Sequence, residues 1–230
     1  MYIRDALSPE YTPRDGSNRT AALRSYVGIT LDTSQYEIAC EQLEKGESKS
    51  EGVPIKLHCA DAGQAEKWTS ELKNDVAFAC KPADSHENWI LGLDTLYHFQ
   101  PSKWPVINYA STTLGASLMA YDLCMSENLS LWQRLVLRLM AFLGHSPFAN
   151  WATADQYRDQ LVAAGYDRDK IEIHDISDHV FRPLARFIRK QDDQLKRYGM
   201  SMGRFRHGAA MFDWWGRAGI VKGCIVIARK

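Results

Sequence analysis

The chain has 230 residues, of which 45% are hydrophobic, and its 28 lysine and arginine residues are matched by 28 aspartate and glutamate residues. Such a chain can bury one sizeable core, so we expect a single globular domain, and its balanced charge gives no overall field that favours nucleic acid as a partner. The five cysteines are scattered and form no C-x-x-C pair, which argues against a zinc site and favours a reducing, cytoplasmic location. No stretch approaches the roughly 20 apolar residues that span a bilayer or resembles a signal peptide, so we expect no integral membrane segment.

The sequence changes character at Tyr26. Residues 1–25 mix charge, proline, glycine and serine without a period of 2 or 3.6 residues, and they predict an irregular N-terminal arm. The string YVGITL that follows is typical of a short strand, whereas SQYEIACEQLEKG has apolar residues at helical spacing and ends at Gly46. Residues 26–230 therefore form the predicted domain.

The middle of the chain continues the alternation of strand and helix. IKLHCA (Ile55–Ala60) predicts a strand, EKWTSELKN a short helix, and NWILGLDTLYHF a strand that ends near Leu93. GASLMAYDL (Gly115–Leu123) predicts a buried strand. The long stretch from Leu129 to Leu143 is amphipathic at helical spacing.

The last third begins with a helix expected from Thr153 to Ala164, with Thr153 or Asp155 near its cap. KIEIHDI then predicts a strand, the residues from Val180 to about Tyr198 a basic helix, and GCIVIARK a closing strand. The piece from Gly199 to Gly219 is predicted to be loop-rich, and we expect its aromatic side chains to pack in a core or lid rather than stack on bases. Strands that alternate with helices in this way predict an α/β fold with a mostly parallel sheet covered on both faces.

Polar residues follow four of the apolar runs. Ligands of open α/β sheets bind beyond the carboxyl ends of the strands, so these residues form the candidate site. They are Thr30, Asp32 and Gln35; then Asp61 and Ala62; then Asp94, Tyr97 and His98; and finally Asp122, which is expected at a strand tip. The first group can reach ribose hydroxyls, the second can hold an adenine ring, and the third is expected near a reacting group. The alternative for each aspartate is a helix cap or a turn residue.

Several strings together resemble the class I S-adenosylmethionine-dependent methyltransferases that act on small molecules. YVGITLDTSQYEIA is similar to the second strand and following helix of that family, HCADA to its adenine-binding strand end, LGLDTLYHF to its fourth strand and GASLMAYDL to its fifth. KIEIHDIS and GCIVIARK are similar to the sixth and seventh strands. The resemblance covers about Tyr26 to Lys230.

This resemblance implies a Rossmann-like, mostly parallel sheet with helices on both faces and an antiparallel last strand. It implies S-adenosyl-L-methionine as cofactor and a small molecule as methyl acceptor. The residues that it assigns to the cofactor are Asp32 and Gln35 at the ribose, Asp61 and Ala62 at the adenine, and Leu93 near the departing methyl group. His98 is placed on the acceptor side, where Tyr97 precedes it in the LYHF string.

The chain departs from the family pattern at its start. Members begin with a strand and a D-x-G-x-G-x-G loop, in which glycine lets the backbone approach the methionine part of the cofactor. Nothing before Val27 offers this loop, because Gly16 and Gly28 are isolated. The predicted fold therefore lacks its first strand, which normally lies between the strands bearing GITL and LGLD. A shortened product, an incomplete gene model and a sheet in which those two strands meet directly all remain open.

Methyl transfer from a sulfonium is a displacement that depends on positioning and desolvation and requires no metal. A base helps where the acceptor is a hydroxyl or an acidic carbon, and histidine titrates in the right range, which makes His98 the candidate base. The alternative is that His98 only packs between strand and helix. His145, in the string GHSPFANW, is a second candidate base, and the alternative for it is a structural role in a loop. We expect His58 to be a sheet residue, and the Y-x-x-x-K string at Tyr166 to arise by chance.

The amphipathic stretch leaves three possibilities. Residues 126–152 can form a lid over an apolar acceptor, the helix can simply pack on the domain, or it can attach to a membrane surface. Two functions follow: methyl transfer to a small, apolar metabolite, or a truncated, catalytically silent methyltransferase-like binding protein. A nicotinamide-dependent oxidoreductase is less favoured, because it too requires a glycine fingerprint. The sequence does not indicate the acceptor atom or the oligomeric state.

Overall fold

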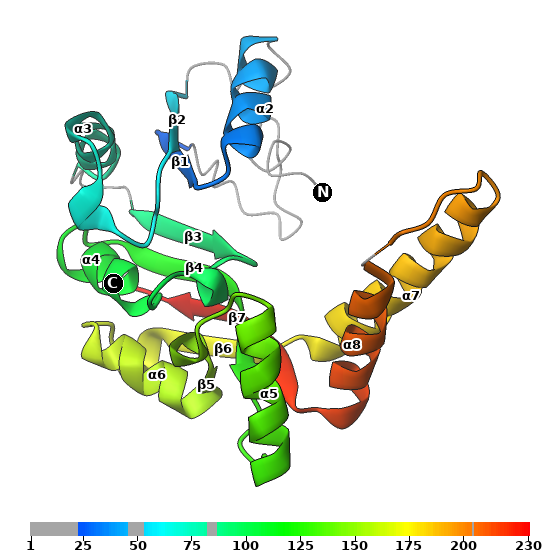
Figure 1. Ribbon diagram of the computed structural model, residues 1–230. Coiled ribbons are helices and arrows are strands. Elements are labelled where there is room, and N and C mark those ends of the chain that lie inside the picture. Colours follow the sequence, from blue (N-terminus) through cyan, green and yellow to red (C-terminus); the bar gives the residue numbers. More distant parts are fainter. Residues whose placement is uncertain (1–22, 46–52, 82–86, 204) are drawn as a thin grey trace, which may run out of the picture. The chain divides into compact units, whose positions relative to one another are not determined.

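The computed structural model describes residues 23–45, 53–81, 87–203 and 205–230. Contacts within the chain divide it into two compact units, Met1–His86 and Glu87–Lys230, which we call unit 1 and unit 2. Each unit is described by itself (Figure 1). Most of the predicted N-terminal arm lies outside the described residues.

Unit 1 is built on two parallel strands, β1 (Tyr26–Thr30) and β2 (Ile55–Cys59). Parallel neighbours need a crossover connection, and it includes helix α2 (Thr33–Glu44). The chain then forms α3 (Ser70–Ala79), whose N-cap Thr69 accepts a hydrogen bond from the backbone of the first helical turn. The two predicted strands are confirmed, and the predicted short helix begins at Ser70 and extends beyond its expected end.

Little of unit 1 is buried. Among its described hydrophobic residues, Trp68, Leu72 and Val76 are buried, and α2 has no buried residue. β1 pairs with β2 along one edge, and no other strand of the described chain pairs with it. The described part of unit 1 therefore buries few apolar side chains, and all three lie in or just before α3.

Unit 2 contains a sheet in the order β3 (Trp89–Leu93), β4 (Ser117–Met125), β7 (Val221–Ala228) and β6 (Ile171–Asp175), and the short β5 (Ala152–Thr153) pairs with β4. β3 and β5 run parallel to β4, and β7 runs antiparallel to both of its neighbours. This order confirms the predicted Rossmann-like sheet with an antiparallel last strand. β3 pairs only with β4 in the described part of the chain, so the absence of a first strand stays a prediction.

One face of the unit 2 sheet is covered by α4 (Trp104–Thr112) and α6 (Ala154–Ala163). Successive side chains of a strand point to opposite faces, and Leu118, Ala120 and Cys124 of β4 lie in the core cluster on this side. The predicted helix α6 is confirmed, with Thr153 as its N-cap in a capping box with Gln156. Helix α4 was not predicted.

The other face is covered by α5 (Leu131–Leu143), α7 (Ser177–Lys196) and α8 (Phe205–Ala218). Leu123 of β4 and Val221 of β7 pack there against Phe181 of α7 and Trp215 of α8. Figure 1 shows α7 and α8 side by side, projecting beyond the sheet of unit 2. Helices thus cover both faces, as predicted. No helix in the described ranges is long and apolar enough to cross a membrane.

The prediction of a loop-rich piece from Gly199 to Gly219 is wrong, because α8 occupies most of it. A Cβ atom at Gly216 would lie 2.7 Å from Cγ of Arg182 on α7, so this glycine permits a close approach of two helices. The expectation that the aromatic residues pack in a core is confirmed by Trp215, which is buried.

Candidate functional site

The carboxyl end of β1 brings Thr30, Asp32 and Gln35 together. Asp32 is the N-cap of α2, and its Oδ1 accepts a hydrogen bond from the backbone N–H of Gln35 at 2.9 Å. The hydroxyl of Thr30 donates to Oε1 of Gln35 at 3.2 Å. The cap alternative is therefore correct for Asp32, but its Oδ2 has no partner among the described contacts and the side chain is exposed. An acceptor for a hydroxyl donor is thus present beside two further polar groups.

The turn after β2 holds Asp61 and Ala62. The carboxylate of Asp61 accepts from the backbone N–H of Gly63 at 2.8 Å and from Nε2 of Gln64 at 2.6 Å. The carbonyl of Asp61 accepts from the indole N–H of Trp68 at 2.9 Å. Asp61 is thus a turn residue held in one orientation. A carboxylate has about four acceptor positions, so this group can still accept from an exocyclic amine.

The chain turns sharply after Leu93, the last residue of β3. Asp94 has a φ of 57°, in the left-handed region that aspartate tolerates better than most residues. Its carboxylate accepts from the hydroxyl of Tyr97 at 2.8 Å. The ring of His98 lies 4.3 Å from that of Tyr97, and His98 is exposed. No hydrogen bond to its ring is found within the described residues, so both ring nitrogens are open to a ligand.

The electrostatics of this turn separate the roles of its residues. Burial raises the pKa of Tyr97 well above its usual range, and the hydrogen bond to Asp94 acts in the same direction. Burial and the charge of Asp94 likewise raise the pKa of the neighbouring Tyr121. Both phenols stay protonated near neutral pH, so Tyr97 keeps the proton that it donates to Asp94 and does not act as a base there.

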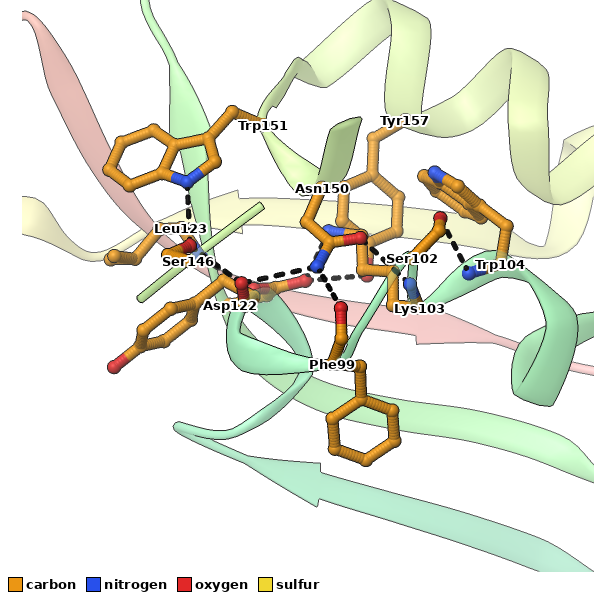
Figure 2. A network of polar contacts seen from close by, with 11 residues as sticks. Phe99, Ser102, Lys103, Trp104, Asp122, Leu123, Ser146, Asn150, Trp151 and Tyr157 are labelled. Carbon is orange, nitrogen blue, oxygen red and sulfur yellow. Dashed lines mark hydrogen bonds and ion pairs between the residues drawn. The ribbon is translucent and has the colours of Figure 1, made fainter. Parts of the chain in front are cut away.

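The segment bearing Tyr97 and His98 is held by a network that the sequence did not reveal (Figure 2). Nδ2 of Asn150 donates to the carbonyls of Tyr97 at 3.1 Å and Phe99 at 2.7 Å, and its Oδ1 accepts from the backbone of Lys103 at 2.7 Å. The hydroxyl of Ser146 donates to the Tyr97 carbonyl at 2.6 Å. Asn150 is fully buried. It is a positioning residue, because its contacts fix the backbone of the turn.

The expectation of Asp122 at a strand tip is wrong. The residue lies inside β4, because pairing with β7 continues to Met125. Its side chain faces α4 and α6, where Oδ2 accepts from Nζ of Lys103 at 2.6 Å and from the hydroxyl of Tyr157 at 2.9 Å (Figure 2). All three side chains are fully buried. Burial and the charge of Asp122 raise the pKa of Tyr157, and the group is part of the core rather than of a ligand site.

Of the remaining histidine and tyrosine residues, His58 and Tyr166 have structural partners. His58 lies in β2 with Nε2 3.0 Å from Oδ2 of Asp75, as expected for a sheet residue. The exposed His145 follows α5 in a loop. Tyr166 donates through its hydroxyl to the carbonyl of Ala116 at 3.0 Å, which accounts for this tyrosine without a catalytic role.

Comparisons with known proteins place the fold. No sequence family and no curated protein matches the chain. It is similar to the cyclopropane synthase MmaA2 from Mycobacterium tuberculosis, at 14% identity and a TM-score of 0.60, over 88% of this chain and 69% of that one. It is also similar to a putative sarcosine dimethylglycine methyltransferase from Galdieria sulphuraria, at 11% identity and a TM-score of 0.59, over 90% of this chain and 79% of that one. A third similar structure is a Haemonchus contortus phosphoethanolamine N-methyltransferase in complex with phosphomonomethylethanolamine and S-adenosylhomocysteine. The identity is 12% and the TM-score 0.61, over 94% of this chain and 51% of that one.

The chain has the fold of the class I S-adenosylmethionine-dependent methyltransferases. The antiparallel β7 agrees with the antiparallel last strand that the resemblance in sequence implies. At such sequence identities the likeness establishes the fold, and activity is argued from the residues.

Proposed function

We propose that this protein transfers a methyl group from S-adenosyl-L-methionine to a small, apolar metabolite. The observation that supports this proposal best is the group of polar side chains that follows β1 in a chain with the methyltransferase fold. There the exposed Asp32 keeps one carboxylate oxygen free beside Thr30 and Gln35, which suits the donor hydroxyls of a ribose. The S-adenosylhomocysteine held by structural neighbours supports the same cofactor.

The donor side of the proposal uses unit 1 for the nucleoside. Asp32 and Gln35 would hold the ribose hydroxyls, and Asp61 with the backbone of Ala62 would hold the adenine. The carboxylate of Asp61 is already oriented by its own turn, so little entropy is lost when it accepts from a ligand amine. Bound S-adenosylmethionine supplies a methyl group on a cationic sulfur. The sequence contains no glycine-rich loop for the methionine part, so we expect weak binding by this chain.

The acceptor side of the proposal uses the turn after β3 in unit 2. A ring nitrogen of His98 would accept the proton that a hydroxyl or acidic carbon loses as it is methylated. Tyr97, whose hydroxyl proton is donated to Asp94, would accept a hydrogen bond from the methyl acceptor through its phenol oxygen, and the backbone at Leu93 would lie beside the methyl donor. Residues 26–230 would form one methyltransferase-like domain, in which residues 126–152 would be a lid over the acceptor. The hydrogen bond from Ser146 to the Tyr97 carbonyl supports this role for the segment.

The test measures cofactor binding and turnover separately. Isothermal titration with S-adenosylmethionine should give weak binding, and a dissociation constant near 1 μM, worth about 8 kcal/mol, would show that other residues replace the glycine-rich loop. Release of S-adenosylhomocysteine is then followed over a panel of apolar alcohols and acidic carbon compounds. His98→Ala should lower the rate by about 100- to 10,000-fold with cofactor affinity unchanged. Asp61→Ala should weaken cofactor binding by about 1–3 kcal/mol.

His207→Ala is the matched control, because His207 is also an exposed histidine of unit 2 but lies on α8. It should leave both quantities unchanged. Full turnover in His98→Ala would remove the base from the proposal and leave positioning alone. Absence of both binding and turnover would favour the second candidate, a catalytically silent methyltransferase-like binding protein.

A further inference from the structure

Helix α5 has a second apolar face that the core of unit 2 does not use. Its inner side contributes Leu137 and Ala141 to the cluster beneath α7 and α8. Its outer side carries large apolar side chains that are exposed. The exposed apolar residues are Leu131, Trp132, Leu135, Leu139, Phe142 and Leu143. Packing against the sheet therefore explains only one side of this helix.

The exposed residues form a continuous stripe. Trp132, Leu135, Leu139 and Phe142 recur at intervals of three and four, which puts them on one side of a helix. A capping box formed by Ser130 and Gln133 stabilises the start of this helix. Scattered apolar residues are ordinary on protein surfaces, but a contiguous stripe of this kind marks an interaction site.

The charges on α5 indicate the kind of partner. Its only charged residues are Arg134 and Arg138, which are exposed, and the helix contains no aspartate or glutamate. A cationic helix with tryptophan, phenylalanine and leucine on its apolar side matches the composition of helices that lie in the surface of anionic membranes. Two copies of α5 packed on each other about a two-fold axis would bring arginines together with no carboxylate on either helix to pair with them.

We propose that α5 docks this protein onto the surface of a membrane that contains anionic lipids. The apolar stripe enters the boundary between headgroups and acyl chains, while Arg134 and Arg138 lie at the level of the lipid phosphates. The helix has 13 residues and is about 20 Å long, so it lies in the surface and does not cross the bilayer. This inference goes beyond methyl transfer and does not depend on it.

The experiment uses the full chain in vesicle flotation. Vesicles of phosphatidylcholine alone are compared with vesicles of phosphatidylcholine mixed with phosphatidylglycerol. We expect binding to the mixed vesicles, weakened by salt. Leu135→Gln combined with Leu139→Gln should lower the partition coefficient by at least about 10-fold, and Arg134→Gln by about fivefold. Glutamine is a good helix former and both leucines are exposed, so the melting temperature should change little.

Phe187→Gln on α7 is the matched control, since Phe187 is also apolar and exposed but lies on another helix; it should leave partitioning unchanged. Absence of binding to both kinds of vesicle would overturn the proposal, as would binding that the leucine variants do not reduce. A dimer that these variants dissociate, without vesicle binding, would assign the stripe to a second copy. Turnover in solution without vesicle binding would refute docking alone, and vesicle binding without cofactor binding would refute methyl transfer alone.

Discussion

Unit 1 and unit 2 begin their helices with the same kind of capping residue, but they differ in how many of their side chains are buried. Each has a strand that leads into a helix with a capping side chain, Asp32 in unit 1 and Thr153 in unit 2. In unit 2 the central strand β4 is paired along both edges and covered on both faces. In unit 1, α2 buries no residue and β1 has one partner among the described strands. Caps and turns thus specify where elements form, whereas layers of packed elements set how stable they are.

The largest difference should appear in hydrogen exchange. Amide protons of β4 should exchange only when unit 2 unfolds, while those of β1 open by local fluctuation. We expect exchange in β1 to be faster by about 1,000-fold, or about 4 kcal/mol of opening free energy. Native-state exchange read by mass spectrometry over both strands measures this ratio. Equal protection would mean that the two units unfold as one, and the comparison would then fail.

Among single substitutions, those in the buried ion pair of Lys103 and Asp122 in unit 2 should lower the free energy of unfolding most. Lys103→Met leaves the carboxylate of Asp122 buried without its cation, and we expect a loss of about 3–5 kcal/mol in the free energy of unfolding, measured in urea. Lys45→Met is the control in unit 1. It breaks the exposed pair with Glu41 at 3.2 Å and should cost less than about 0.5 kcal/mol.

A double variant distinguishes charge from packing at this point. Lys103→Met with Asp122→Leu removes both charges and should recover much of the loss, since well-packed apolar residues can replace a buried pair. The hydroxyl of Tyr157 would then lack its acceptor, so recovery is expected to be incomplete. A double variant no better than Lys103→Met would show that the shape of the site, not its charge, is what stabilises unit 2.

The turns after β2 and β3 allow a comparison of the two units in which we expect smaller changes in the free energy of unfolding. Asn150→Leu removes three hydrogen bonds within the core of unit 2 and should cost about 1–3 kcal/mol, because the freed carbonyl and amide groups are buried. Asp61→Ala removes two bonds in a partly exposed turn of unit 1, where water can replace them, and should cost less than about 1 kcal/mol. Urea denaturation of each variant measures both values. Equal costs would mean that the turn after β2 is as well packed as the turn after β3.

The sequence predicted those parts of the fold that depend on neighbouring residues. The ends of β1, β2 and β3 follow from apolar runs that stop at polar residues, and the cap of α6 follows from the T-x-x-Q string at Thr153. Helix α8 was missed, and Gly216 within it allows a close approach to Arg182 of α7, a contact that no local pattern indicates.

The candidate site shows the same division. Thr30, Asp32 and Gln35 lie within one turn of chain, so their proximity was predictable. Asn150 lies 53 residues beyond Tyr97, and no local pattern connects an asparagine in FANW to that carbonyl. Asp122 was misplaced for the same reason, because the partner strand that extends β4 to Met125 is β7, which is distant in the sequence.

The smallest effect tests the comparison most directly, because the same chemical change is made in each unit. Asp32→Ala and Thr153→Ala each remove an N-cap side chain, which accepts at 2.9 Å in α2 and 3.3 Å in α6. Each should cost its helix about 1 kcal/mol. α6 buries Tyr157 and Leu161 in the core, so the loss in Thr153→Ala should appear as reduced global stability in urea. α2 buries nothing, so the loss in Asp32→Ala should appear as faster exchange within α2 while the urea midpoint stays unchanged. A midpoint shift in Asp32→Ala equal to that in Thr153→Ala would show that α2 contributes to the cooperative core, and that unit 1 is more tightly packed than its burial indicates.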